Sequence, residues 1–305
     1  MANQSLVTEF LLMGFTDDHD MQIMYFVVFL VIYLLALIGN LLLSVAVILN
    51  HHLHAPMYFF LVNLSFCDVC FISTIIPKAM AASLTNNKQI SYAGCAAQVF
   101  SVFTFAGFEL ALLTVMAYDR YVAICHPLQY TLMMNWDACL QMVAASWIST
   151  LIHALLHTIL TFRLNFCKFS KIEQFFCDVP HLLMISCTDT RISQILILVV
   201  GITLDSLCSG FIFISYGYIF SAVLKIPSVQ GRYKAFSTCT PHLTVFSLFL
   251  ISAVFAYMRP QSLSSHTLDL LSAVLYTILP PLLNPLIYSF RNKDIQKAVW
   301  KMLKK

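Results

Sequence analysis

Charged residues are scarce in this sequence. They make up 10% of its 305 residues, whereas about a quarter of an ordinary soluble domain is charged. This scarcity excludes a soluble globular enzyme, a disordered chain and a solvated repeat array. The net charge is only +3, so the composition gives no support for nucleic-acid binding. An integral membrane protein with an apolar, lipid-facing surface fits this composition.

Enzyme motifs and internal repeats are also missing. The sequence has no GxSxG, HExxH or Walker motif, so we expect no enzymatic activity. No lysine occurs between Lys234 and Lys293, which excludes a retinal Schiff base in the last apolar segment. No repeat of about 20–50 residues relates two halves of the chain, which counts against transporters built from inverted repeats.

Long apolar runs fill most of the chain, and 60% of its residues are hydrophobic. A spanning helix needs about 20 apolar residues, and these runs are continuous, whereas β-barrel strands alternate with a period of two. The sequence therefore predicts an all-α membrane protein with a bundle of seven transmembrane helices. The expected spans are residues 25–49, 57–80, 96–118, 140–160, 195–224, 238–257 and 268–290.

Lysine and arginine indicate the orientation. The first 24 residues contain none, whereas segment 224–235 contains three and the tail from residue 291 contains six. Cytoplasmic segments carry the excess of positive charge. We therefore expect an extracellular tail at 1–24, a seven-helix domain at 25–290 and a cytoplasmic segment at 291–305. Four basic residues in a long outer loop weaken this signal without reversing it.

The two ends of the chain carry further signals. Asn3 begins a glycosylation sequon on the expected outer side. No basic start precedes a short apolar region there, so we expect no removable signal peptide. In the C-terminal segment Ile295, Val299 and Met302 recur at helical spacing, with lysines between them. This pattern predicts a short amphipathic helix on the inner leaflet.

Two acidic residues fall inside expected spans at similar depth. Asp68 lies roughly 16 Å from the inner end of the second span, and Glu109 roughly 15 Å from that of the third. A charge in lipid is costly and needs a reason. Carboxylate oxygens suit a hard cation such as Na⁺, whereas a protonated, hydrogen-bonded pair would lock helix packing. The residues alone leave both interpretations open.

Other polar residues in the expected spans and outer loops are candidates as well. Asp205 could line a ligand cavity or bond a neighbouring serine or threonine. Asp119 and Arg120, at the inner end of the third span, can pair with each other or with a partner. His153 and His157 have spacing that suits a metal, although such pairs are more often structural. Four cysteines fall in outer segments, where disulfides are stable and three pairings are possible: Cys95, Cys167, Cys177 and Cys187.

Several motifs together give the chain a family resemblance. It resembles an olfactory (odorant) receptor of the rhodopsin-like class A of G-protein-coupled receptors, over essentially its whole length. The stretches that carry the resemblance are GN at 39–40, LHAPMYFFL at 53–61, LSFCD at 64–68, MAYDRYVAICHPLQY at 116–130, SY at 215–216, KAFSTC at 234–239 and PPLLNPLIYSFRNKD at 280–294. NPLIY alone would indicate only the wider class.

Part of the sixth span departs from the family pattern. Most members carry FYG where this sequence has Phe249, Leu250 and Ile251, and Thr240-Pro241 replaces a more usual pair of small residues. The missing aromatic at Leu250 puts its usual role as pocket floor and switch in doubt. This pattern, followed by FAYMRP, resembles the small subgroup numbered family 14.

The resemblance implies roles for particular residues. The activation switch would comprise Asp119, Arg120, Tyr121, Tyr216, Asn284, Pro285 and Tyr288. At rest Arg120 would pair with Asp119, and on activation it would swing toward the G protein. Tyr216 would then meet Tyr288. The sodium site would comprise Asp68, Glu109, Asn40 and Asn284, with Na⁺ as a possible allosteric ion and no other metal or cofactor. The disulfides would be Cys95–Cys177 and Cys167–Cys187.

The resemblance also places a ligand pocket in the outer half of the bundle. Its expected lining is Val102, Phe103, Ala106, Gly107, Leu110, Val200, Gly201, Leu204, Asp205, Leu250, Ala253, Val254, Tyr257 and Thr277. This mostly apolar set suits a small volatile odorant. The expected partners are that ligand, a heterotrimeric G protein of the stimulatory olfactory type, membrane lipids and a possible trafficking chaperone. The expected location is the plasma membrane.

Two alternatives stay open at this point. One is a non-odorant receptor of the same class, although an amine receptor usually needs an acid where Val102 and Phe103 stand. The other is a channel or transporter, which would need a continuous polar path through the membrane. Apart from the pair at the midplane, the acids do not form such a path.

Overall fold

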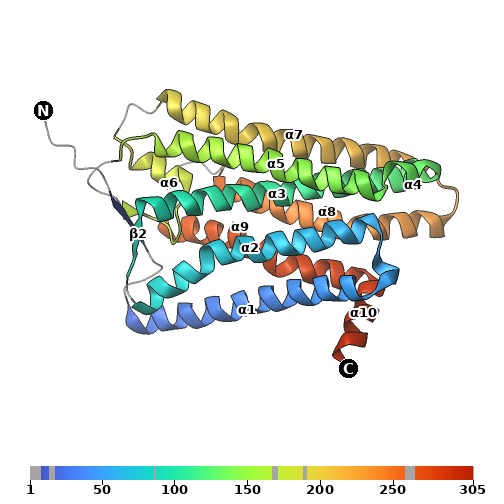
Figure 1. Cartoon of the computed structure of the whole chain (residues 1–305), viewed down its shortest axis with the longest axis horizontal. Coiled ribbons are helices and arrows are strands. Elements are labelled where there is room, and N and C mark those ends of the chain that lie inside the picture. The colour runs from blue at the N-terminus through green and yellow to red at the C-terminus, as the bar shows by residue number, and fades with distance from the viewer. Residues whose placement is uncertain are drawn as a thin grey trace, which may run out of the picture.

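The computed structural model describes residues 8–13, 18–85, 87–166, 171–187, 191–257 and 265–304. Seven of its helices are long and apolar enough to cross a membrane, which confirms the predicted bundle (Figure 1). They are α1 (His19–Leu49), α2 (Pro56–Thr85), α3 (Tyr92–Cys125), α5 (Trp136–Phe162), α7 (Arg191–Leu224), α8 (Val229–Tyr257) and α9 (His266–Arg291). Every helix contains its expected span, and most extend beyond it into polar sequence.

Polar residues start these helices by satisfying the free N–H groups of the first turn. The side chain of Asp18 accepts from the backbone N–H of Asp20 at 2.9 Å, before α1. Ser91, Asn135 and Ser265 cap α3, α5 and α9 in the same way. The apolar runs therefore give the helices their lengths, and the caps fix where several of them begin.

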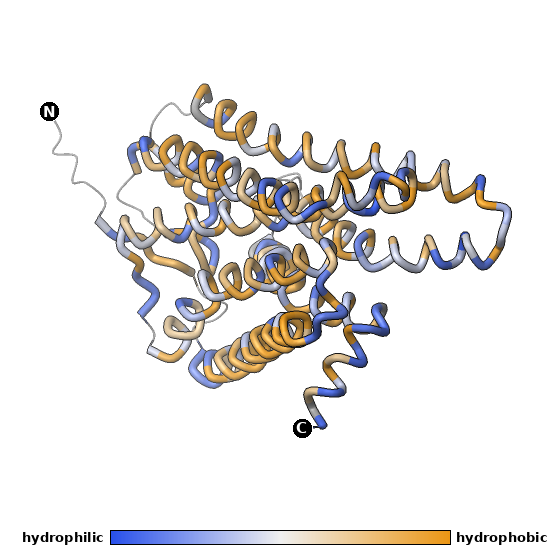
Figure 2. Tube along the Cα trace, turned by 45° about the vertical axis from the view of Figure 1, so that its right-hand side comes forward, coloured by the Kyte–Doolittle hydropathy of each residue, from blue (hydrophilic) through white to orange (hydrophobic). Residues whose placement is uncertain are grey.

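The helices differ in how much of their surface other helices cover. α3 is the central helix, and it contacts α2, α5, α7 and α8. α1 keeps many large apolar side chains exposed, among them Val31, Leu35 and Ile38, and orange residues run along both faces of its tube (Figure 2). Such a surface is stable only against lipid, so α3 forms the core and α1 lies at the edge.

A small three-stranded sheet covers one end of the bundle. β1 (Glu9–Leu12) pairs antiparallel with β2 (Gln89–Ser91) and parallel with β3 (Lys171–Ile172). The buried side chains Phe10 and Leu12 pack on an apolar cluster that includes Cys95 and Cys177. Nearby, α6 (Val179–Met184) is a short helix of the same loop as β3. The sheet joins segments that are far apart in sequence, and no motif predicted it.

The opposite end carries the C-terminal helix α10 (Lys293–Leu303), which leaves the bundle at an angle (Figure 1). Asn292 caps it, and Ile295 and Ala298 are buried against the bundle. The expected amphipathic helix is therefore present. Two short 3-10 turns, η1 (His51–Leu53) and η2 (Pro127–Gln129), and the short helix α4 (Tyr130–Met133) lie at this same end.

Candidate functional site

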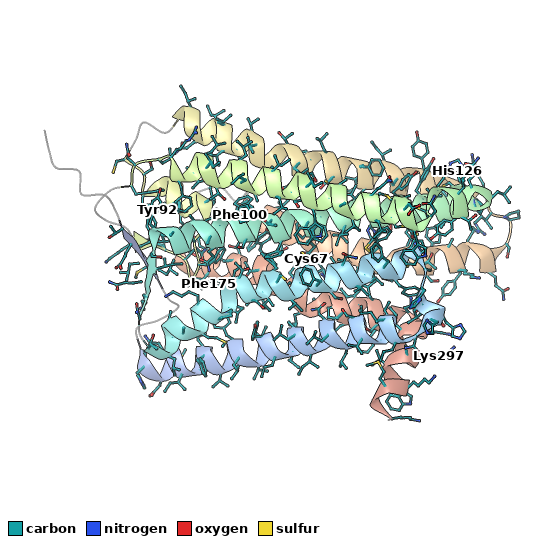
Figure 3. The ribbon with its side chains drawn as sticks, viewed as in Figure 1. Cys67, Tyr92, Phe100, His126, Phe175 and Lys297 are labelled. Carbon is teal, nitrogen blue, oxygen red and sulfur yellow. A yellow bond between two sulfur atoms is a disulfide. The ribbon has the colours of Figure 1, made fainter. Side chains whose placement is uncertain are left out.

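Two acidic side chains meet an amide at the middle of the bundle. Asp68 of α2 is 0% exposed and Glu109 of α3 is 1% exposed. The Nδ2 of Asn284, from α9, donates to Asp68 Oδ1 at 3.2 Å, to Asp68 Oδ2 at 3.1 Å and to Glu109 Oε1 at 3.0 Å. Cys67, next to Asp68, lies halfway along the bundle (Figure 3). Asp68 and Glu109, which the sequence places at similar depth, are thus joined by Asn284 of a third helix.

Three buried side chains of α1 and α9 have an oxygen atom without a partner in the part of the chain that the structure describes. Among the described residues, Asn284 Oδ1, Asn40 Oδ1 and the Tyr288 hydroxyl have no hydrogen-bond partner. The ion pairs found in the described residues involve other acids. Unused oxygens beside two carboxylates are what a small hard cation would need. The oxygen atoms of this cluster therefore suit coordination of the expected Na⁺. They also suit a proton shared between the two carboxylates.

Asn40, an expected neighbour of the sodium site, makes two hydrogen bonds through its amide nitrogen. Its Nδ2 donates to Ala36 O at 2.9 Å and to Pro281 O at 2.8 Å. The carbonyl of Pro281 needs this donor because its usual helical partner is residue 285, a proline without an N–H. Gly39 allows the approach, since a Cβ there would lie 3.1 Å from Pro285 Cγ. The pair Gly39-Asn40 thus joins α1 to the proline bend of α9.

The expected pair of the switch is closed near the C-terminal end of α3. Arg120 Nε donates to Asp119 Oδ2 at 3.0 Å, and Arg120 Nη2 donates to the same oxygen. The other carboxylate oxygen accepts from the Tyr130 hydroxyl of α4 at 2.8 Å. Partial burial and the charge of Asp119 raise the pKa of Tyr130 above its usual value, so this phenol stays a donor. Tyr130 is a partner that sequence reasoning missed.

A buried histidine links three helices next to this pair. His242 of α8 places Nε2 2.8 Å from Leu113 O of α3 and Nδ1 2.8 Å from the Tyr216 hydroxyl of α7. A carbonyl can only accept, so Nε2 carries the proton and Nδ1 accepts from Tyr216. In this conformation Tyr216 therefore bonds His242, and its meeting with Tyr288 stays a prediction for the active conformation. Sequence reasoning missed His242, and the signal that could have indicated it is a single histidine within an apolar run.

Two other switch residues have separate surroundings. The Tyr121 hydroxyl lies 3.0 Å from His126 Nε2, at the C-terminal end of α3, where Figure 3 labels His126. Tyr288 is buried in α9 and packs in the main core. The structure thus gathers Asp119 and Arg120 in one cluster and Tyr216 in the adjacent one, while Asn284 lies among the acids at midplane.

The expected pocket residues of α3 divide between two environments. Val102, Ala106 and Leu110 are buried in the core. Phe103 stacks on His157 of α5 with ring centroids 4.1 Å apart. Gly107 faces α5 and α7, since a Cβ there would lie 3.4 Å from Thr150 and 4.0 Å from Leu204. This face of α3 therefore adjoins the polar side chains of α5.

Two histidines of α5 face α7 with free ring nitrogens. His153 Nε2 lies 2.9 Å from Val200 O, and its Nδ1 has no partner among the described residues. His157 is 3% exposed, and neither of its ring nitrogens has a partner there. Gly201 makes room for this ring, since a Cβ there would lie 2.9 Å from His157 Nε2. The described residues contain no cluster of three metal-ligating side chains.

Acidic and phenolic groups gather toward the outer ends of α7, α8 and α9. Asp205 lies within electrostatic range of His153, Tyr257 and Tyr276. Tyr257 and Tyr276 pack edge to face with centroids 5.3 Å apart, and Asp178 of the outer loop lies beside Tyr257. Sequence reasoning found Asp205 and Tyr257 but missed Tyr276 and Asp178.

The remaining expected pocket residues come from α8 and α9. Leu250 and Ala253 pack against the core, and the Thr277 hydroxyl donates to Ala273 O at 2.7 Å within its own helix. Val254 is 44% exposed, whereas Ser252 is buried. Two residues turn a helix by about 200°, so Val254 lies on the outward face and is the weakest member of the set.

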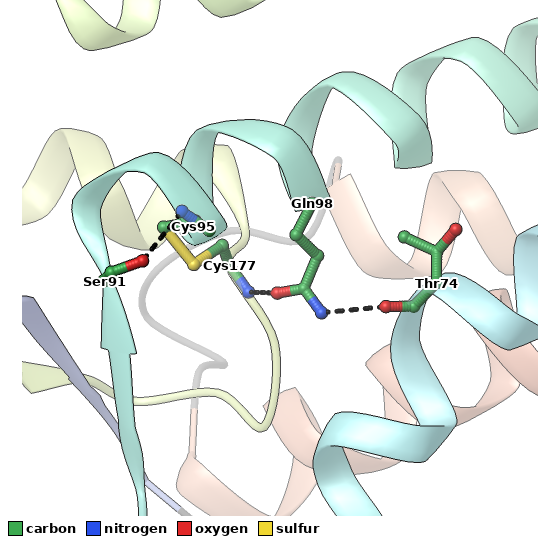
Figure 4. Close-up of a disulfide and its surroundings, with 6 residues drawn as sticks. Thr74, Ser91, Cys95, Gln98 and Cys177 are labelled. Carbon is green, nitrogen blue, oxygen red and sulfur yellow. Dashed lines mark hydrogen bonds between the residues drawn. A yellow bond between two sulfur atoms is a disulfide. The ribbon is translucent and has the colours of Figure 1, made fainter.

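A disulfide ties α3 to the outer loop. Cys95 and Cys177 are bonded, with Cα atoms 5.6 Å apart (Figure 4), as expected. Cys187 is also disulfide-bonded, but its expected partner Cys167 lies outside the described residues, as does the sequon residue Asn3. The remaining described cysteines are free.

Comparisons with known proteins agree with this geometry. The family model described as olfactory receptor matches residues 29–305. Human olfactory receptor 14A16 is 48% identical over 304 residues, covering 100% of this chain and 98% of the relative. Human olfactory receptor 14A2 is 49% identical over 305 residues, covering 100% and 97%.

A likeness to a solved structure supports the fold. Squid rhodopsin superposes with a TM-score of 0.77 at 17% identity, covering 93% of this chain and 81% of the rhodopsin chain. The bundle therefore has the rhodopsin fold, and the match to the olfactory receptor family makes the chain a receptor rather than an enzyme. With the family model over most of its length and relatives of family 14 over all of it, the chain belongs to the olfactory receptor family.

Proposed function

We propose that this receptor binds a small, mostly apolar odorant in the outer half of the bundle, between α3, α5, α7, α8 and α9. The apolar side chains of α3 supply most of the contact surface. Asp205, Tyr257 and the histidines of α5 supply polar groups that orient the ligand. Small-molecule sites typically combine an apolar lining with a few such groups.

The closed pair Asp119–Arg120 is the observation that carries the signalling proposal. Arg120 is held by an acid that Tyr130 also holds, so the resting arrangement is stabilised from both sides. A ligand that binds the open arrangement more tightly shifts the equilibrium by its difference in affinity. In the open arrangement α8 moves outward, His242 leaves Tyr216, and Arg120 turns toward the G protein.

The proposed partner is a stimulatory, olfactory-type G protein, and the readout is cyclic AMP. Lys225, Arg232 and Lys234 lie near the α7–α8 turn, and α10 adds further lysines, of which Figure 3 labels Lys297. These groups would face the acidic surface of the G protein and anionic lipid. In this proposal the C-terminus lies in the cytoplasm, and the N-terminus, with a glycosylated Asn3, lies outside. A trafficking chaperone would assist delivery to the plasma membrane.

We also propose that Na⁺ binds beside Asp68 and Glu109 in the resting state. The unused Oδ1 of Asn284 and the two carboxylates would hold the ion. Sodium should then stabilise the purified receptor by mass action, and the Glu109→Ala variant should not respond. Equal thermal stabilisation of wild type and Glu109→Ala by sodium would contradict the site, with potassium as the control cation.

A cyclic-AMP assay in cells against an odorant panel tests the signalling proposal. We expect at least one odorant to raise cyclic AMP in wild type and no response in Arg120→Ala at equal surface expression. Arg163→Ala, which removes the same charge at the outer end of α5, should keep most of the response. An odorant-gated current that persists without any G protein would refute the proposal and favour a channel.

A further inference from the structure

A groove lies between the outer ends of α2 and α3, and none of the expected odorant-pocket residues lines it. Its volume is about 350 Å³, near the lower end of the range of small-molecule sites, about 300–1,000 Å³. Thr74 and Lys78 of α2, Ile90 of β2, and Ala97, Gln98 and Ser101 of α3 form most of its wall. It is therefore a candidate site separate from the odorant pocket.

The charge of this groove comes from Lys78. Its Nζ donates to the backbone carbonyl of Gln89 in β2 at 2.6 Å. An ammonium has three donors, so this contact leaves two for another group. None of the ion pairs found among the described residues includes Lys78. The hydrogen bond to β2 thus holds a positive charge at the groove with donors to spare.

The polar groups of Gln98 and Thr74 in the groove already have hydrogen-bond partners. Gln98 Nε2 donates to Thr74 O at 3.1 Å, and its Oε1 accepts from the backbone N–H of Cys177 at 2.9 Å (Figure 4). The Thr74 hydroxyl donates to Cys70 O at 2.9 Å. These contacts fix the wall, so a ligand finds its strongest free donor at Lys78 and apolar surface at Ile90 and Ala97.

We propose that the groove binds a small amphiphile with a carboxylate head and a short apolar chain. The carboxylate accepts from Lys78, and the chain lies against Ile90 and Ala97. A neutral alcohol would lack the charge-assisted hydrogen bond, and an amine would be repelled. Gln98 links the groove to the Cys95–Cys177 loop, so an occupant would act on the outer end of the receptor.

Binding of radiolabelled octanoate to purified receptor tests the site directly. The receptor is placed in nanodiscs of neutral phosphatidylcholine, and 1-octanol is the uncharged competitor. We expect Lys78→Met to weaken octanoate binding by about tenfold, with Lys78→Arg close to wild type. Lys171→Met removes the same charge from β3, which β1 separates from the groove strand β2, and should change nothing. Wild-type affinity in Lys78→Met, or equal competition by octanol, would overturn the proposal.

A second variant tests the groove without touching the lysine. Ala97→Trp should fill it and abolish octanoate binding, whereas Ala93→Trp, at another exposed position of α3 outside the groove, should leave binding unchanged. Octanoate binding that survives Ala97→Trp would refute the assignment. Displacement of octanoate by phosphatidylglycerol in the discs would give the site to a lipid headgroup instead. The assay contains no G protein, so its failure differs from a failure of the signalling proposal.

Discussion

Two buried groups of polar side chains, Asp119 with His242 at the cytoplasmic end and the histidines of α5 in the outer half, differ in how many of their atoms have hydrogen-bond partners. At the cytoplasmic end, both oxygens of Asp119 and both ring nitrogens of His242 have partners. In the outer half, neither ring nitrogen of His157 has one among the described residues. A satisfied buried group stabilises one arrangement, whereas an unsatisfied one carries a desolvation cost that a ligand can relieve. The contacts of Asp119 and His242 therefore stabilise the resting arrangement, whereas the unpaired nitrogens of His157 are available to a ligand in the proposed pocket.

The midplane cluster lies between these extremes. The Asn284 amide N–H₂ serves both carboxylates, while its Oδ1 is left unused. A group whose donors are occupied and whose acceptor is free can change partners at low cost when the helices move. The hydrogen bonds of the midplane cluster can therefore change when the helices move in the outer half or at the cytoplasmic end.

Removing the shared donor should have the largest effect. Asn284→Leu leaves two buried carboxylates without their amide, and we expect a loss of about 3 kcal/mol in the free energy of unfolding. Thermal unfolding of the purified receptor measures it. Leu286→Ala, at an exposed position of the same helix, should cost far less. Equal melting temperatures for wild type and Asn284→Leu would show that Asn284 does not stabilise the midplane cluster.

Tyr130→Phe should release one side of the closed switch. Asp119 loses one of its donors, which weakens the resting arrangement by about 1.5–3 kcal/mol. Basal cyclic AMP should rise about tenfold at equal surface expression, provided that the resting state dominates in wild type. Tyr233→Phe alters an exposed tyrosine of α8 and should leave the basal level unchanged. A basal level unaffected by Tyr130→Phe would show that this contact does not hold the switch.

Gly201→Ala should show how tightly the outer half is packed. The added Cβ would lie 2.9 Å from His157 Nε2, so the ring must shift, at a cost of about 1–2 kcal/mol. Gly210→Ala is the matched control in the same helix, because nothing lies within 4 Å of its Cβ. It should stabilise α7 by up to about 1 kcal/mol. Equal melting temperatures for the two variants would contradict the close packing.

His157→Phe should have the smallest effect on stability and still change ligand response. The substitution removes two unpaired nitrogens and can keep the stacking on Phe103, so the free energy of unfolding should change by less than about 0.5 kcal/mol. His242→Phe, which breaks two hydrogen bonds, should cost more by thermal unfolding. A large destabilisation by His157→Phe would show that the outer histidine is structural rather than available.

The sequence predicts those features that a single segment of the chain determines. Seven apolar runs give the helices, and counting residues along α2 and α3 places Asp68 and Glu109 at one depth. It does not predict the sheet, because β1, β2 and β3 pair across distant segments and each is only two to four residues long. His242 and Tyr130 were missed for the same reason, since their partners lie on other helices.

The bond between Asn40 and Pro281 has a consequence for synthesis. It joins residues 241 positions apart. The amide of Asn40 in the first span can therefore make this hydrogen bond only after the last span has been inserted. A chain that ends before α9 leaves that amide without its interhelical partner in the bilayer, where polar groups are costly. The last span thus completes the hydrogen bonding of the first, just as its Asn284 completes that of Asp68 and Glu109.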